Sequence, residues 1–192
     1  MKNKLALGIS ILTVVPMVAL LTIIGIYLND GSFYGYQDFW VVWSIVFLVI
    51  LPSGAYALKH IHPRFREKGR TWERNMAFVT GVTGQVVGFS GAWYLEAPEG
   101  VKKLFMVYLL AGLLLSTTNF LVGKKASGHA CGVSGPISLL TVIFGVKAGA
   151  LFLLMPFVFW SRLKLQRHTL HELLLGTMIG ITATIISFRY GG

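Results

Sequence analysis

The sequence predicts an all-α integral membrane protein, on three observations. Of its 192 residues 55% are hydrophobic and only 12% are charged, which is too little charge for a soluble domain of this size. Apolar runs of about 20 residues recur along the chain, and a run of that length crosses a bilayer as a helix. A backbone in lipid must satisfy its own hydrogen bonds, which favours helices. We expect one membrane domain over residues 1–192, a polytopic bundle of six or seven segments.

The first half of the chain contains two apolar segments. Residues 7–28 follow a short basic N-terminus as the apolar part of a signal peptide does, but no small-residue cleavage site is evident, so we expect a retained span. Residues 29–38 form a polar loop. Residues 39–58 form the second segment, with Trp40 and Trp43 near its start as anchors at the membrane interface.

Residues 59–75 are the longest polar stretch, and six of them are Lys or Arg. Residues 76–95 form an apolar segment rich in Gly and Thr, a composition that suits close packing of helices. A short loop then leads to the fourth apolar segment, residues 104–122. The last segment is expected over residues 168–188.

Residues 130–160 admit two interpretations. One helix from 136 to 160 would place Lys147 near the middle of the membrane, at a cost of about 2.5–3.5 kcal/mol. Alternatively, two short helices turn near Lys147, which has Gly145 and Gly149 close by. A single span would separate the polar stretches on either side of it by about 30 Å. We expect the hairpin, because it returns both stretches to one face.

The charge of the chain is strongly basic, with 17 Lys and Arg against 7 Asp and Glu. The basic residues lie in polar loops, so the expected partners are the lipid bilayer with its anionic headgroups and a phosphate substrate, and no nucleic acid. With the hairpin, residues 59–75, 124–129 and 161–168 share the face of the N-terminus. Positive-inside reasoning then favours the cytoplasmic side of the inner cell membrane. A phosphate site needs the same charges, so the side stays open.

His168 and Glu172 are four residues apart, which on a helix places them on one face. A carboxylate that accepts the imidazole N–H fixes the tautomer and stabilises the cation formed when the other nitrogen attacks. The alternative is a histidine at the membrane boundary beside an unrelated surface carboxylate.

Ser127-Gly128-His129 lies where a loop meets an apolar segment. Free backbone N–H groups at a helix start favour an anion, and glycine lets the backbone approach it. A histidine there can protonate a leaving alkoxide, which contributes about 10²–10⁴ in rate. The simpler interpretation is a serine that caps the helix, followed by an incidental histidine.

Arginine side chains are candidate phosphate-binding groups. Arg162 can bind two phosphate oxygens at once. Arg70 and Arg74 are one turn apart, with Lys68 nearby, and offer a second grip. The alternative for residues 59–75 is a solvated basic loop that binds anionic headgroups.

Taken together, these motifs resemble the type 2 phosphatidic acid phosphatase (PAP2) superfamily across residues 59–185. The second family motif, Pro-Ser-Gly-His, appears as Ala126-Ser127-Gly128-His129. The third, Ser-Arg-x5-His-x3-Asp, appears as Ser161-Arg162-x5-His168-x3-Glu172. The first, Lys-x6-Arg-Pro, does not match, because five residues separate Lys68 from Arg74 and Asn75 replaces the proline.

The resemblance implies a lipid phosphate phosphatase, typified by activity on phosphatidic acid, that needs no metal or other cofactor. His168 would attack phosphorus to give a phosphohistidine, Glu172 would orient it, and His129 would act as general acid on the departing alcohol. The resemblance also implies six spans and, in many members, action from the extracytoplasmic face. The implied phosphate-binding residues are Ser127, Gly128, Ser161, Arg162 and, from the poorly matching motif, Lys68, Arg70 and Arg74.

Three other functions remain open from the sequence. A prenyl diphosphate phosphatase or a lipid phosphotransferase would use the same residues. A metallohydrolase would use His168, His171 and Glu172, although the chain has no His-Glu-x-x-His motif. A lipid-binding or transport protein would keep the site as a relic.

Overall fold

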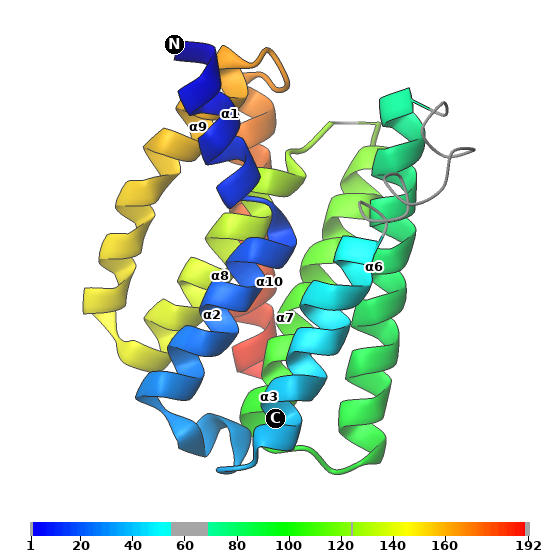
Figure 1. The fold of residues 1–192 in the computed structure, drawn as a ribbon, viewed down its shortest axis with the longest axis vertical. Coiled ribbons are helices and arrows are strands. Elements are labelled where there is room, and N and C mark those ends of the chain that lie inside the picture. The colour runs from blue at the N-terminus through cyan, green and yellow to red at the C-terminus, as the bar shows by residue number, and fades with distance from the viewer. Residues whose placement is uncertain (1, 55–68, 124, 191–192) are drawn as a thin grey trace. The chain divides into compact units, whose positions relative to one another are not determined.

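The computed structural model describes residues 2–54, 69–123 and 125–190, and the side chains of these except residues 2, 69–75 and 121 (Figure 1). Every regular element in the described part is a helix, as the sequence predicts. The chain divides into two compact units. One comprises Ala19–Phe105, and the other joins Met1–Val18 to Met106–Gly192. The candidate residues whose side chains are described all belong to the second of these units.

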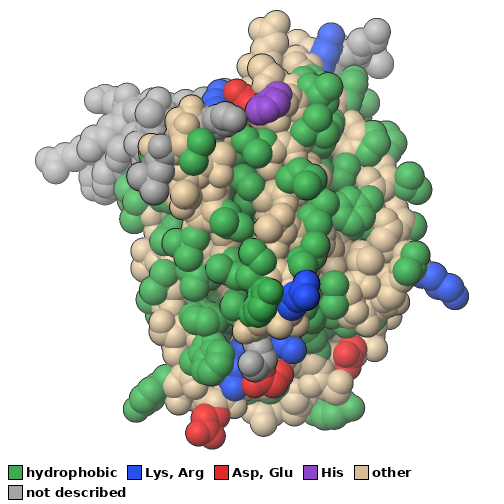
Figure 2. All heavy atoms as spheres, turned by 180° about the vertical axis from the view of Figure 1, so that it is seen from behind, with side chains coloured by type: hydrophobic (Ala, Val, Ile, Leu, Met, Phe, Trp, Pro, Cys, Tyr) green, Lys and Arg blue, Asp and Glu red, His purple; other side chains and the backbone are tan. Residues whose placement is uncertain are grey.

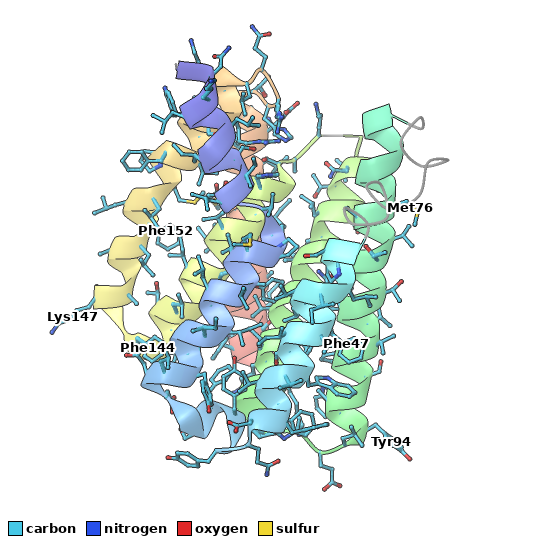
Figure 3. The ribbon with its side chains drawn as sticks, in the orientation of Figure 1. Phe47, Met76, Tyr94, Phe144, Lys147 and Phe152 are labelled. Atoms are coloured by element: carbon cyan, nitrogen blue, oxygen red, sulfur yellow. The ribbon has the colours of Figure 1, made fainter. Side chains whose placement is uncertain are left out.

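The Ala19–Phe105 unit holds most of α2 (Val15–Asn29), the 3-10 turn η1 (Gly31–Tyr34), α3 (Asp38–Ile45) with its π-helical continuation η2 (Val46–Ile50), α6 (Gly69–Tyr94) and the first part of α7 (Glu99–Ser116). The glycines of α6 permit close packing, as its composition predicts. A methyl group at Gly84 would overlap the Phe47 carbonyl, and one at Gly91 would overlap the Trp43 ring. Figure 3 labels Phe47, which lies in η2.

The first apolar segment is helical but not straight. It is divided into α1 (Lys2–Leu12) and α2, which meet at a bend of 54°. Pro16 explains the break, because proline has no N–H to offer the Leu12 carbonyl and its ring would clash with that carbonyl. Val14 therefore donates to Ile11, three residues back, at 3.4 Å, rather than to Ser10 at the α-helical spacing. The expected retained span over residues 7–28 stays a prediction, because the bent pair as a whole is long and apolar enough for a span, either as one broken span or as a re-entrant loop.

The expected hairpin is confirmed in the Met106–Gly192 unit. Helix α8 (Gly128–Phe144) ends at Gly145, whose φ of 81° is open to glycine but strained for other residues. The chain then returns through the 3-10 segment η4 (Val146–Leu154) and α9 (Met155–Lys164). Lys147 is exposed and points away from the helices, while Phe152 packs on the core between α8 and α9 (Figure 3). A single helix from 136 to 160 is excluded.

Helix α10 (Leu170–Tyr190) lies beside α8 and runs parallel to it, two residues later at its start than the sequence predicts (Figure 1). Small residues allow the contact. A methyl group at Gly180 would overlap the Ser134 hydroxyl, and one at Gly176 would overlap the Ser127 carbonyl. Ser134 donates to the Thr177 carbonyl at 3.1 Å. This spacing of two glycines is typical of helices that pack closely in membranes.

The membrane class is supported by helix length and composition. Three helical segments of the described chain are long and apolar enough to cross a bilayer: Glu99–Phe120, Val146–Lys164 and Leu170–Tyr190. The bent pair α1 and α2 would make a fourth. Asp38–Gly54 and Gly128–Phe144 are shorter apolar helices. Hydrophobic side chains cover much of the face drawn in Figure 2, as expected for contact with lipid. The count of six or seven segments stays a prediction.

Candidate active site

Ser127 fixes the loop before α8 against the first turn of α10. Its backbone N–H donates to the Glu172 carbonyl at 2.9 Å, and its hydroxyl accepts from the Ala130 N–H at 3.4 Å. The second contact is an N-cap, which satisfies one of the free N–H groups at a helix start. The close approach needs the missing side chain of Gly176. Ser127-Gly128-His129 therefore opens a helix, as the sequence predicts.

The turn between α9 and α10 is held by backbone and capping contacts. Arg167 donates its N–H to the Arg162 carbonyl at 3.0 Å, and Gln166 adopts a left-handed φ of 51°. Thr169 and Glu172 then form a reciprocal cap. The Glu172 N–H donates to the Thr169 hydroxyl at 3.4 Å, and the Thr169 N–H donates to the Glu172 carboxylate at 3.3 Å. This cap aims the carboxylate back at the turn.

His168 meets that carboxylate. Nδ1 of His168 lies 2.7 Å from Oε2 of Glu172, and the other carboxylate oxygen lies 3.8 Å from Nζ of Lys125. The predicted pair is present, but its geometry differs from the prediction, because His168 precedes α10 instead of sharing a helical face with Glu172. With Nδ1 donating to the carboxylate, Nε2 is the nitrogen with a lone pair available for attack.

The pKa of His168 lies below its ordinary value of 6.5. Partial burial is the main cause, and the positive charge of Arg162 adds to it, while the hydrogen bond to Glu172 acts in the opposite direction. A lowered pKa keeps the imidazole neutral at pH 7, which is the state that a nucleophilic nitrogen requires.

His129 and two arginines converge on one residue of α1. Nε2 of His129 lies 3.3 Å from the backbone oxygen of Ser10, so this nitrogen carries a hydrogen and donates it. Nη1 of Arg162 donates to the Ser10 hydroxyl at 2.8 Å, and Nη1 of Arg167 donates to the same oxygen at 3.3 Å. Ser10 and Arg162 are almost completely buried. Three donors from α8, α9 and the following turn thus surround two oxygens of a single residue.

Burial and, next, the positive charge of Arg162 lower the pKa of His129 from 6.5 to about 3. His129 lies in the first turn of α8, outside the three helices long enough to cross the bilayer. Its imidazole is therefore neutral at pH 7. A bound anion would offset the charge of the arginine and favour the imidazolium.

The structure brings together the predicted residues Ser127, His129, Arg162, His168 and Glu172 through these contacts. Gly128 occupies the first position of α8. Ser161 is also close by, but it is fully buried and its hydroxyl donates to the Ala6 carbonyl at 2.7 Å. This contact ties α9 to α1 and gives Ser161 a structural role.

The phosphate-binding role predicted for Lys68, Arg70 and Arg74 stays a prediction. Lys68 lies outside the described residues. Arg70 and Arg74 lie in the first two turns of α6, and their side chains are outside the described part.

Sequence reasoning missed Ser10 and Arg167. Arg167 directly precedes the proposed nucleophile His168, and a basic residue at that position could have indicated a role in phosphate binding. Ser10 had a weaker signal in Pro16, which breaks the helix and leaves the Ser10 carbonyl without the partner that a continuous helix would supply. No pattern in the sequence shows that α1 packs on α9.

Within the described residues, no group of three or more His, Cys, Asp or Glu side chains is arranged to hold a metal ion. No family model, curated protein or solved structure matches this chain. The described part of the chain is all-helical, and three of its helical segments are long and apolar enough to cross a membrane. A cluster of histidine, arginine and carboxylate side chains lies where α8 and α10 begin and α9 ends.

Proposed function

We propose that this protein is a membrane-embedded lipid phosphate phosphatase that works through a phosphohistidine. The observation that carries the proposal is the convergence of two separate stretches, residues 125–129 and 162–172, on one site. That site combines a carboxylate-oriented imidazole with a second imidazole and two guanidinium groups. This combination offers a nucleophile, a proton donor and charge complementary to a phosphate.

In the proposed reaction, Nε2 of His168 attacks phosphorus, and the phosphorus–oxygen bond to the lipid alcohol breaks. Arg162 and Arg167 hold the phosphoryl oxygens as negative charge redistributes. His129 gives its proton to the leaving oxygen. Water then attacks the phosphohistidine, the phosphorus–nitrogen bond breaks, and His129 takes the proton that the water loses. The sum is hydrolysis of one phosphate ester.

The charge of the substrate is part of this mechanism. His129 is neutral at pH 7 because its burial and the neighbouring Arg162 lower its pKa. A phosphate monoester brings up to two negative charges, since its second pKa lies near 6. We infer that the substrate itself supplies the field that protonates His129, so the acid is charged only when an ester is present.

A lipid substrate is favoured by the surroundings of the site. Large apolar side chains near the same ends of the helices are exposed, among them Leu7 and Ile11 on α1 and Leu163 on α9. In a bilayer these side chains contact acyl chains, so a headgroup phosphate can reach the arginines while its tails stay in lipid.

The test is phosphate release by purified protein in detergent with EDTA, across phosphatidic acid, prenyl monophosphates and prenyl diphosphates. We expect release from at least one of these lipids by the wild type and only background release by His168→Ala. His171→Ala is the matched control, because His171 is exposed and three residues away. Full turnover by His168→Ala would refute the mechanism. Loss of turnover with EDTA, or in His171→Ala alone, would favour a metal site.

A further inference from the structure

Ser10 presents two oxygens to the three donors that we assign to the phosphate group. Its hydroxyl oxygen accepts from both Arg162, at 2.8 Å, and Arg167, at 3.3 Å. Its carbonyl oxygen faces Nε2 of His129 at 3.3 Å. In the proposed reaction the arginines hold phosphoryl oxygens and His129 faces the leaving oxygen. Arg162, Arg167 and His129 therefore donate to oxygen atoms both in their contacts with Ser10 and in the proposed complex with a phosphate ester.

The bend in the first apolar segment makes this arrangement possible. In a continuous helix the Ser10 carbonyl would accept from Val14, but Val14 donates to Ile11 instead. The freed carbonyl turns to His129. Helix α1 is otherwise tied to α9 by the bond from Ser161 to the Ala6 carbonyl. The polar contacts of α1 with α8 and α9 thus involve the His129 and Arg162 side chains, which we propose bind the substrate.

We propose that α1 acts as an internal substitute for the substrate: Ser10 occupies the phosphate position in the free protein, and the phosphate group displaces it. This inference rests on the proposed phosphate site. An anionic oxygen binds guanidinium more strongly than a neutral hydroxyl does, so phosphate displaces the Ser10 hydroxyl from the arginines. Ser10 thereby reduces the apparent affinity for phosphate.

The experiment measures binding of inorganic phosphate to the purified full chain in detergent by calorimetry. Ser10→Ala and Ser10→Cys remove the strong acceptor oxygen, and we expect both to bind phosphate about tenfold more tightly than the wild type. Ser10→Asp adds a fixed anion, and we expect it to lose phosphate binding. Ser138→Ala is the control, because Ser138 is a buried serine of α8 whose hydroxyl donates to the carbonyl four residues back. It should bind phosphate as the wild type does.

A second readout follows α1 itself. If phosphate displaces Ser10, amide hydrogens of residues 2–12 should exchange faster when phosphate is bound. Equal or weaker phosphate binding by Ser10→Ala and Ser10→Cys, or slower exchange in α1, would overturn the inference and make Ser10 a residue that positions the arginines. If phosphate binding by the Ser10 variants is equal or weaker while lipid hydrolysis is normal, only the proposal that Ser10 takes the place of phosphate is refuted. Tighter phosphate binding by Ser10→Ala without any hydrolysis refutes the phosphatase alone.

Discussion

Nδ1 of His168 lies 2.7 Å from Oε2 of Glu172, and the cap formed by Thr169 directs that carboxylate towards the imidazole. One carboxylate therefore begins a helix and orients the proposed nucleophile. The contact connects local structure to chemistry, because any change that shifts the start of α10 also moves His168.

The first prediction concerns this carboxylate. Glu172→Gln should lower the rate of phosphate release at least about tenfold, because the neutral amide stabilises the imidazolium character of the attacking histidine less well. Glu172→Asp should retain more activity than Glu172→Gln, since it keeps the charge. Glu99→Gln is the control, because Glu99 is an exposed carboxylate paired with Lys102 at 2.9 Å, and its loss should leave the rate unchanged. Equal rates for Glu172→Gln and the wild type would contradict an orienting role.

The second prediction concerns pH. Because the pKa of His168 is lowered in the folded protein, the folded state binds fewer protons than the unfolded state between that pKa and 6.5. The resulting stability is present above pH 6.5 and is lost as the pH falls through the folded pKa. NMR titration of the ring proton in micelles, assigned with His168→Asn, should give a midpoint below 6.5. Glu172→Gln should move that midpoint lower still, because it removes the contact that raises the pKa. A wild-type midpoint above 6.5 would refute both the lowered pKa of His168 and the loss of stability at acid pH.

The third prediction separates the roles of the two histidines. His129→Ala should slow hydrolysis of unactivated lipid esters by about 10²–10⁴-fold but slow aryl phosphates much less, since a good leaving group needs no proton. His168→Ala should abolish both reactions. The measurement is the ratio of the two rates in each variant. The same loss for both kinds of ester in His129→Ala would exclude the acid role.

The fourth prediction tests the guanidinium. Arg162→Lys keeps the charge but loses the two-pronged geometry, so we expect kcat/KM to fall by roughly 10–100-fold. Arg189→Lys, at the far end of α10 where Arg189 contacts the ring of Tyr190, should leave kcat/KM unchanged. If lysine fully replaced Arg162, the arginine would serve only as a positive charge.

The fifth prediction concerns packing at the site. A methyl group at Gly176 would overlap the Ser127 carbonyl, so Gly176→Ala should destabilise the fold by about 1–3 kcal/mol and reduce activity by moving α10. At Gly8, in α1, a methyl group meets no atom within 4 Å. Gly8→Ala should therefore be neutral or stabilise by up to about 1 kcal/mol. Thermal unfolding in detergent measures both changes, and a neutral Gly176→Ala would refute the close approach.

Part of the site was predictable because its residues are near one another in the sequence. His168 and Glu172 are four residues apart, and Ser127-Gly128-His129 is continuous, so spacing alone identified them. The hairpin was also predictable, because Gly145 and Gly149 flank a lysine that a membrane centre disfavours. The break at Pro16 follows from an elementary property of proline, which has no N–H to continue a helix.

By itself, the sequence determined the all-helical class, a turn near Lys147 and the residue types available for phosphate chemistry, because composition and local backbone preferences decide these features. Only the tertiary structure decided which groups meet. The contacts of Ser10 with Arg162 and His129 join residues more than 100 positions apart, and the bond from Ser127 to Glu172 depends on a glycine in another helix. Such contacts arise from the packing of whole helices, which no local pattern encodes.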